Sequence, residues 1–161
     1  MAGVGVDIIE IERVKRAMLR TPRFALRVFT PEERAYCDKR GNPFASYAGC
    51  FAAREAVLKA LGVGFGDGVG YQDVSVGHDD RGRPVALLAG RAQEIAAEQG
   101  ITEVYLSISH THDVAVANAV AATPASQPRR DERVDEKALI AAQFKEARSL
   151  LDELDRKEGD A

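Results

Sequence analysis

The feature that most limits how this chain can fold is a helical segment with an almost entirely apolar body, CFAAREAVLKALG, at residues 50–62. The helical pattern begins near Asn42 and ends at Gly62, a residue type that commonly terminates helices. A helix of this composition is suited to burial, where charged groups lose their hydration. It nevertheless carries three charged side chains, which need an explanation: Arg54, Glu55 and Lys59.

Strand and helix patterns occur on both sides of this segment. The first is a strand at residues 3–9, whose β-branched residues share one face while its glycines and Asp7 share the other. We expect the glycine face to be open, with the carboxylate at its end. A capping box of Thr30 and Glu33 predicts a short helix from Pro31. The other expected elements are a helix at 10–19, a hairpin at 73–76 and 84–88, a helix at 91–99, and a hairpin at 103–109 and 113–121.

Composition narrows the functional classes only in part. The chain has 161 residues, which suffices for one domain with a core and an appendage. Its formal net charge of -3 gives no overall reason to bind nucleic acid. Two cysteines, Cys37 and Cys50, are too few for a disulfide framework. The N-terminal residues show neither a signal peptide nor an apolar run able to span a bilayer, so we expect a cytoplasmic protein without membrane contact.

Residues 123–161 differ in composition from the rest of the chain. We expect the compact domain to cover residues 1–122 and a Pro- and Ser-containing linker to cover residues 123–130. Residues 131–161 are predicted to form a charged amphipathic helical tail. Its apolar positions are spaced by four and three, as in a short coiled-coil seam: Ile140, Phe144, Ala147, Leu151 and Leu154.

Two remote carboxylates, Asp7 and Glu55, are the strongest candidates for chemistry. Each has an ordinary alternative, because Asp7 can cap the following helix and Glu55 can form an exposed pair with Lys59 one turn later. Two carboxylates on apolar elements also suit Mg²⁺, which is usually bound by one or two carboxylates together with phosphate oxygens and water. In that interpretation Lys59 contacts a phosphate, and the glycines from Gly62 to Gly70 allow close backbone approach of the ligand.

The segment LSISHTH offers a second group of candidates. A nucleophilic pair of Ser109 and His110 has poor geometry, because neighbouring strand residues point to opposite faces. Zinc binding by His110 and His112 lacks a third ligand nearby. Two interpretations of His110 stay open, a phosphate or nucleotide contact and a turn histidine that is bonded to the backbone.

Arginines recur at spacings of three and four on the first predicted helix, at positions 13, 16 and 20. This spacing places Arg13, Arg16 and Arg20 in one stripe, which is either a solvated face or a contact surface for an acidic protein.

The order of these motifs along the chain is more specific than any one of them. GVGVDIIEIER, FTPEE, FAAREAVLKALG, GRP and LSISHT follow one another between Gly3 and Ala121. In this order the sequence resembles the holo-acyl-carrier-protein synthases, the short bacterial type of 4′-phosphopantetheinyl transferase. The resemblance implies an α+β fold, with a small antiparallel sheet packed with helices, that assembles as a homotrimer with active sites between subunits.

The resemblance also implies an activity. Coenzyme A would give its 4′-phosphopantetheine arm to a serine of an apo acyl carrier protein, releasing adenosine 3′,5′-bisphosphate in a Mg²⁺-dependent reaction. Asp7 and Glu55 match the metal-binding residues, and Lys59 matches the lysine that contacts phosphate. The coenzyme A-binding set becomes Lys59, Gly62, His110, Thr111 and Arg54, and the carrier-protein-binding set Arg13, Arg16 and Arg20.

Two departures from the family pattern affect this assignment. Arg54 stands where the family usually has lysine, and Cys50 stands where arginine is common. A phosphate contact from position 50 is therefore absent or replaced, with Arg54 as a candidate. Two further functional classes remain open: a module that binds coenzyme A or carrier protein without transfer, and an interaction protein organised by its C-terminal helix.

Overall fold

The computed structural model describes residues 3–21, 23–126, 140–142, 144–146 and 148–149. The chain divides into two units, residues 1–127 and 128–161, which we describe separately. In the second unit the described residues are helical, and Ile140 and Phe144 are exposed. The rest of the predicted seam and the linker from residue 127 onward lie outside the described residues, so the division into domain, linker and tail stays a prediction.

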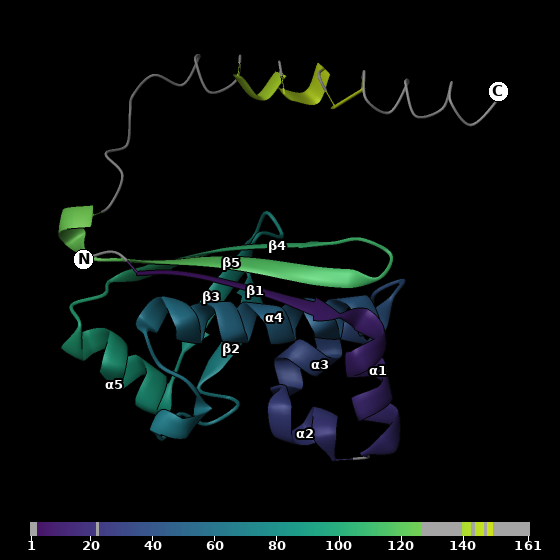
Figure 1. The fold of residues 1–161 in the computed structure, drawn as a ribbon, viewed down its shortest axis with the longest axis horizontal. Coiled ribbons are helices and arrows are strands. Elements are labelled where there is room, and N and C mark those ends of the chain that lie inside the picture. The colour runs from purple at the N-terminus through teal and green to yellow at the C-terminus, as the bar shows by residue number, and fades with distance from the viewer. Residues whose placement is uncertain (1–2, 22, 127–139, 143, 147, 150–161) are drawn as a thin grey trace. The chain divides into compact units, whose positions relative to one another are not determined.

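The first unit is built on a three-stranded antiparallel sheet and one long helix. The strand order is β1 (Gly3–Glu10), β5 (Val114–Ala122) and β4 (Glu103–His110). Helix α4 (Pro43–Leu61) runs beneath this sheet, with α1, α2 and α3 toward one of its ends and α5 toward the other (Figure 1). It contacts all three strands and also α1, α3, α5 and β2, so the predicted burial of this helix and the α+β class are confirmed.

Small residues allow α4 to approach the sheet closely. The inward-facing residues of β5 are fully buried alanines: Ala115, Ala117, Ala119 and Ala121. On β1, an added Cβ at Gly3 would overlap the carbonyl of Ala60, and one at Gly5 would overlap that of Ala56. The expectation of an open glycine face is therefore wrong, because this face packs on α4.

The opposite face of β1 is the exposed one in the described chain. Val4, Val6 and Ile8 are 71%, 54% and 64% exposed. Strand alternation separates the two faces but does not say which of them is buried. The absence of a Cβ at Gly3 and Gly5 decides this, since only the glycine face admits a helix backbone at so short a distance.

Both ends of α4 follow their predicted signals. The side chain of Asn42 accepts a hydrogen bond from the backbone N–H of Ala45 at 3.2 Å, and Pro43 occupies the first turn. Gly62 ends the helix with φ of 72°, a left-handed conformation that favours glycine.

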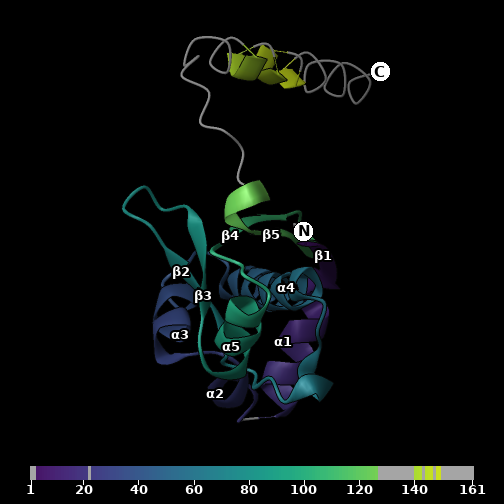
Figure 2. The same cartoon turned by 90° about the vertical axis from the view of Figure 1, so that its left-hand side faces the viewer.

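The remaining elements surround α4 away from the sheet. They are α1 (Ile11–Arg20), α2 (Phe24–Val28), α3 (Pro31–Cys37), the hairpin β2 (Val74–His78) and β3 (Pro84–Leu88), and α5 (Gly90–Glu98). The capping box of α3 is present, and the β2–β3 hairpin lies to one side of α4 (Figure 2). Helix α2 was not expected. Within the described part of the chain, no helix has the length and apolar character needed to cross a bilayer.

Candidate active site

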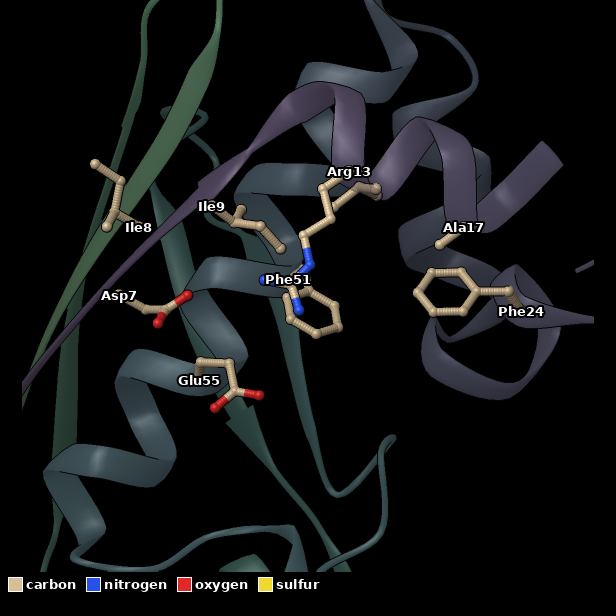
Figure 3. Close-up of a pocket in the computed structure, with 9 residues that line it drawn as sticks. Asp7, Ile8, Ile9, Arg13, Ala17, Phe24, Phe51 and Glu55 are labelled. Atoms are coloured by element: carbon tan, nitrogen blue, oxygen red, sulfur yellow. The ribbon is translucent and has the colours of Figure 1, made fainter. Parts of the chain in front are cut away.

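A cavity of about 390 Å³ lies where β1, α1, α2 and α4 meet. Figure 3 shows Asp7 on β1 and Glu55 on α4, which both line this cavity, and Arg13 extending toward it from α1. The structure therefore brings together the two predicted metal-binding residues, which are 48 positions apart in the chain. The full lining is Asp7, Ile8, Ile9, Arg13, Val14, Ala17, Phe24, Phe51 and Glu55.

Lys59 joins β1 to α4 at this site. Its Nζ donates to Asp7 Oδ1 at 2.8 Å and to the carbonyl of Val6 at 3.0 Å. Lys59 thus pairs with Asp7 and not with Glu55, so the alternative of an exposed Glu55–Lys59 pair is wrong. The N-cap residue of α1 is Glu10, and no side chain forms a capping hydrogen bond with this helix. The alternative interpretation, in which Asp7 caps α1, is therefore wrong.

The environment of Glu55 disfavours its ionised form. Burial raises the pKa of Glu55, and the charge of Asp7 raises it further, while Lys59 and Arg54 act in the opposite direction. An ionised Glu55 is therefore stabilised by any cation that enters the cavity.

This donor set fits Mg²⁺. Two oxygen ligands from the protein match the one or two carboxylates that usually bind this ion next to phosphate oxygens and water. Among the residues that the structure describes, no group of three or more His, Cys, Asp or Glu side chains is placed to bind a metal ion. The remaining ligands would therefore have to come from substrate and water.

The arginine stripe lies on α1, and its three members are exposed. Only Arg13 belongs to the lining of the cavity, while Arg16 and Arg20 lie on the same helix outside that lining. Phe24 and Phe51 form apolar parts of the wall and were not predicted as site residues. Nothing in the sequence distinguishes them from core residues, and Phe24 lies on the unexpected helix α2.

His110 lies in a second cavity, of about 220 Å³, and not beside Asp7 and Glu55. Its Nδ1 is 3.3 Å from the carbonyl of Thr111, as the turn interpretation predicted, and this contact leaves Nε2 for a ligand. The side chain of Thr111 accepts hydrogen bonds from the N–H groups of Asp113 and Val114, both at 3.3 Å, and so shapes the turn. The lining is Tyr36, Arg40, Ala45, Ser46, Gly49, Cys50, Val76, His78, Gly82, Pro84, Ile108 and His110.

Of these lining residues only His110 was predicted as a site residue, and the unpredicted ones include Tyr36, Arg40 and His78. These three come from α3, the turn after it and the end of β2, so no local motif joins them. The rings of Tyr36 and His78 stack with their centroids 3.8 Å apart. His112, the second histidine of the zinc alternative, instead pairs with Asp113 on the surface at 2.8 Å.

Arg54 is not available to coenzyme A. Its side chain is fully buried, and Nη2 donates two hydrogen bonds to the carboxylate of Glu33, at 2.9 and 2.7 Å. Nε donates to the carbonyl of Val74, and Nη1 donates to the carbonyl of Cys50. The assignment of Arg54 as a phosphate contact is therefore wrong, because its donors hold α3, α4 and β2 together. Gly62, at the far end of the same helix, faces open space and stays a candidate.

Comparisons with known proteins cover the first unit. The family model of the 4′-phosphopantetheinyl transferase superfamily matches residues 3–119. A holo-[acyl-carrier-protein] synthase of Caldanaerobacter subterraneus is 46% identical over 118 residues, which are 73% of this chain and 92% of the relative. One of Alkaliphilus metalliredigens is 49% identical over 120 residues, 74% of this chain and 97% of the relative.

Solved structures agree with these sequence matches. The holo-[acyl-carrier-protein] synthase of Neisseria meningitidis superposes with a TM-score of 0.68 at 36% identity, covering 75% of this chain and 98% of the other. That of Helicobacter pylori, solved in complex with coenzyme A, has a TM-score of 0.66 at 30% identity and covers 74% of this chain and 99% of the other.

Proposed function

Because this chain belongs to the 4′-phosphopantetheinyl transferase superfamily, as an enzyme of the holo-[acyl-carrier-protein] synthase type, we propose that it transfers the 4′-phosphopantetheine arm of coenzyme A to an apo acyl carrier protein. The acceptor is a serine, and the second product is adenosine 3′,5′-bisphosphate. The observation that carries this proposal is the convergence of Asp7 and Glu55 in one cavity, with Lys59 bonded to Asp7.

In this proposal Asp7 and Glu55 are the residues that would hold Mg²⁺. When bound, the ion supplies electrostatic stabilisation of the charge that develops on the phosphoryl oxygens. Lys59 uses two of its three N–H donors on Asp7 and on the carbonyl of Val6, so one donor is free for a phosphate oxygen. Phe24 and Phe51 give the cavity an apolar wall, which would shield one side of the reacting groups.

The transfer step is a substitution at phosphorus. The serine oxygen forms a bond to the β-phosphorus, and the bond from this phosphorus to the bridging oxygen breaks, so the electron pair leaves with adenosine 3′,5′-bisphosphate. The serine proton goes to Glu55 or to a water molecule. Burial and the charge of Asp7 raise the pKa of Glu55, which favours this carboxylate as the base.

We propose that the second cavity holds the nucleotide half of coenzyme A, with His110 and Thr111 at its edge. The two cavities are separate within one chain, which supports active sites assembled from neighbouring subunits of a homotrimer. The exposed apolar face of β1, with Val4, Val6 and Ile8, suits such a subunit contact.

The acidic carrier would meet the stripe of Arg13, Arg16 and Arg20 on α1. All three guanidinium groups are exposed, and Arg13 reaches the lining of the Asp7–Glu55 cavity. A positive stripe beside the reacting groups steers and orients an acidic partner. We keep a cytoplasmic location as part of this proposal.

Intact-mass analysis tests the function directly. An apo acyl carrier protein incubated with this protein, coenzyme A and Mg²⁺ should gain one phosphopantetheine, and a chelator should prevent the gain. A module that only binds would leave the carrier mass unchanged. Deleting residues 123–161 distinguishes a transferase from an interaction protein that is organised by its C-terminal helix. A transferase should keep substantial activity in residues 1–122, whereas such an interaction protein should not.

A further inference from the structure

Among the residues that the structure describes, the lining of the Asp7–Glu55 cavity contains one basic side chain, that of Arg13. Figure 3 shows this side chain extending toward the cavity from α1. Arg16 and Arg20, the other members of the arginine stripe, lie outside the lining. Recognition of a carrier on the surface of α1 does not require this difference, so the position of Arg13 calls for a second explanation.

The guanidinium of Arg13 has no ion-pair partner in the part of the chain that the structure describes. Asp7 and Glu55 line the same cavity, yet neither carboxylate lies within 4.0 Å of it. By contrast, Lys15 on the same helix pairs with Glu12 at 3.3 Å. The cavity of about 390 Å³ therefore has an unpaired cation on one side and two carboxylates on the other, with space for a ligand between them.

The backbone of Arg13 is fixed where α1 begins. Helix α1 follows directly on β1, the strand that carries Asp7. The N–H of Ile11 donates to the carbonyl of Asp113 at 2.8 Å, and the side chains of Ile11 and Val14 are buried. Arg13 therefore projects from an anchored helical turn, so that binding a ligand requires the ordering of this one side chain and not of the helix.

The charge of the donor favours a second cationic side chain at this cavity. In the proposed function, Lys59 is the cationic side chain assigned to the diphosphate, and it is already paired with Asp7 at 2.8 Å. Negative charge develops on the phosphoryl oxygens during transfer. Arginine suits this charge, because its planar guanidinium presents its donors in a rigid fork that fits two phosphate oxygens.

We propose that Arg13 is a catalytic residue, whose guanidinium binds the non-bridging oxygens of the diphosphate and stabilises the charge that develops there during transfer. The bonds are those of the proposed function, on which this inference rests. The serine oxygen bonds to the β-phosphorus, the bond to the bridging oxygen breaks, and its electron pair leaves with adenosine 3′,5′-bisphosphate. The serine proton goes to Glu55 or to water, and Arg13 keeps its own proton throughout.

Steady-state kinetics separate this role from carrier recognition. Arg13→Gln should lower kcat at saturating carrier by about a hundredfold, the loss expected when one donor to a developing oxyanion is removed. Arg13→Lys keeps the charge without the fork and should recover part of this loss. Arg20→Gln removes the same charge from the same helix outside the cavity lining, so it should raise the carrier KM more than it lowers kcat. A raised carrier KM with unchanged kcat in Arg13→Gln would refute the catalytic role.

Calorimetric titration without any carrier gives a second readout. Coenzyme A in the presence of Mg²⁺ should bind Arg13→Gln about tenfold more weakly than the unaltered protein, because a charge-assisted hydrogen bond is lost. Arg91→Gln is the matched control and should leave the affinity unchanged, since Arg91 lies on α5 outside both cavity linings. Equal affinities of Arg13→Gln and the unaltered protein would show that Arg13 does not contact the donor.

The two measurements also distinguish this inference from the proposed function. Transfer at the normal kcat by Arg13→Gln would refute the inference and leave the proposed function intact. A carrier whose mass stays unchanged with the unaltered protein would refute the transfer and, with it, the catalytic role of Arg13. In that case the titration would still decide whether Arg13 binds the diphosphate.

Discussion

At the scale of single residues, Asp7 and Glu55 decide whether the proposed chemistry is possible. Asp7→Asn and Glu55→Gln each remove a carboxylate of the predicted metal site at almost constant volume. Turnover should fall about a hundredfold or more, since the diphosphate charge then lacks its counter-charge. Initial rates of carrier modification measure this loss, and circular dichroism checks the fold.

Asp80→Asn is the control for this experiment. Asp80 is an exposed carboxylate in the turn between β2 and β3, remote from the lining of the Asp7–Glu55 cavity, so its removal should leave the rate unchanged. A rate near that of the unaltered enzyme in Asp7→Asn or Glu55→Gln would contradict the metal site.

The pKa of Glu55 predicts how stability depends on pH. Its folded-state pKa lies above the ordinary value of 4.5, so between these two values the folded protein holds more protons than the unfolded chain. Stability without metal should therefore fall as pH rises above about 4.5, relative to Glu55→Gln, which has no such proton. Thermal unfolding in chelator between pH 4 and 7 measures this difference.

Adding Mg²⁺ completes the same measurement. A cation near Glu55 stabilises its ionised form, so Mg²⁺ should raise the melting temperature of the unaltered protein at pH 7 more than that of Glu55→Gln. Equal shifts in both proteins would indicate that the ion does not bind at this carboxylate.

At the scale of elements, the contact between β1 and α4 positions Asp7 and Glu55, the proposed catalytic groups. A Cβ at Gly5 would overlap the carbonyl of Ala56 and lie 2.9 Å from the Cβ of Lys59. Gly5→Ala should lower the free energy of unfolding by about 1–3 kcal/mol or more, the range for overpacking in a core. Because β1 carries Asp7 and α4 carries Glu55, turnover should fall as well.

Gly41→Ala is the matched control for Gly5→Ala. A Cβ at Gly41 meets no atom within 4 Å, and the φ of this residue is not positive. Urea unfolding of both variants measures the difference, and an equally mild effect of Gly5→Ala would show that the strand can move away from the helix without cost.

Helix α1 carries the prediction for carrier recognition. Arg16→Glu reverses a charge in the middle of the exposed stripe, so the KM for the carrier should rise more than the KM for coenzyme A. Arg81→Glu makes the same change in net charge at an exposed position between β2 and β3 and should have little effect on the carrier KM. A similar rise in both variants would assign the effect to net charge rather than to the stripe.

At the scale of the whole molecule, the separation of the two cavities predicts complementation between subunits. Asp7→Asn damages the first cavity and His110→Ala the second, so each variant alone should be strongly impaired. If sites form between chains, random mixing of equal amounts should give about a quarter of sites with both cavities intact. Activity measured after joint refolding tests this expectation, and the absence of any recovery would place both cavities of a site on one chain.

Much of this molecule was predictable because the relevant signals are local. Helix caps, alternating strands and turn residues predicted the long helix and both hairpins within a few residues, and the order of motifs indicated the family. Helix α2 was missed because its five residues are too few to show a helical period. Asp7, Glu55 and Lys59 became candidates because charged groups on apolar elements require partners, and their roles stay a prediction.

The tertiary structure decided what those charged groups contact. The chain alone indicates that Glu55 is followed by Lys59 one turn later, and that Arg54 carries a positive charge. Packing determines that Lys59 bonds to Asp7 and that the buried Arg54 forms an ion pair with Glu33. It also determines that the glycine face of β1 is buried. The physical reason is that local patterns depend on neighbours a few residues apart, whereas ion pairing and burial depend on which remote surfaces approach closely enough to exclude water.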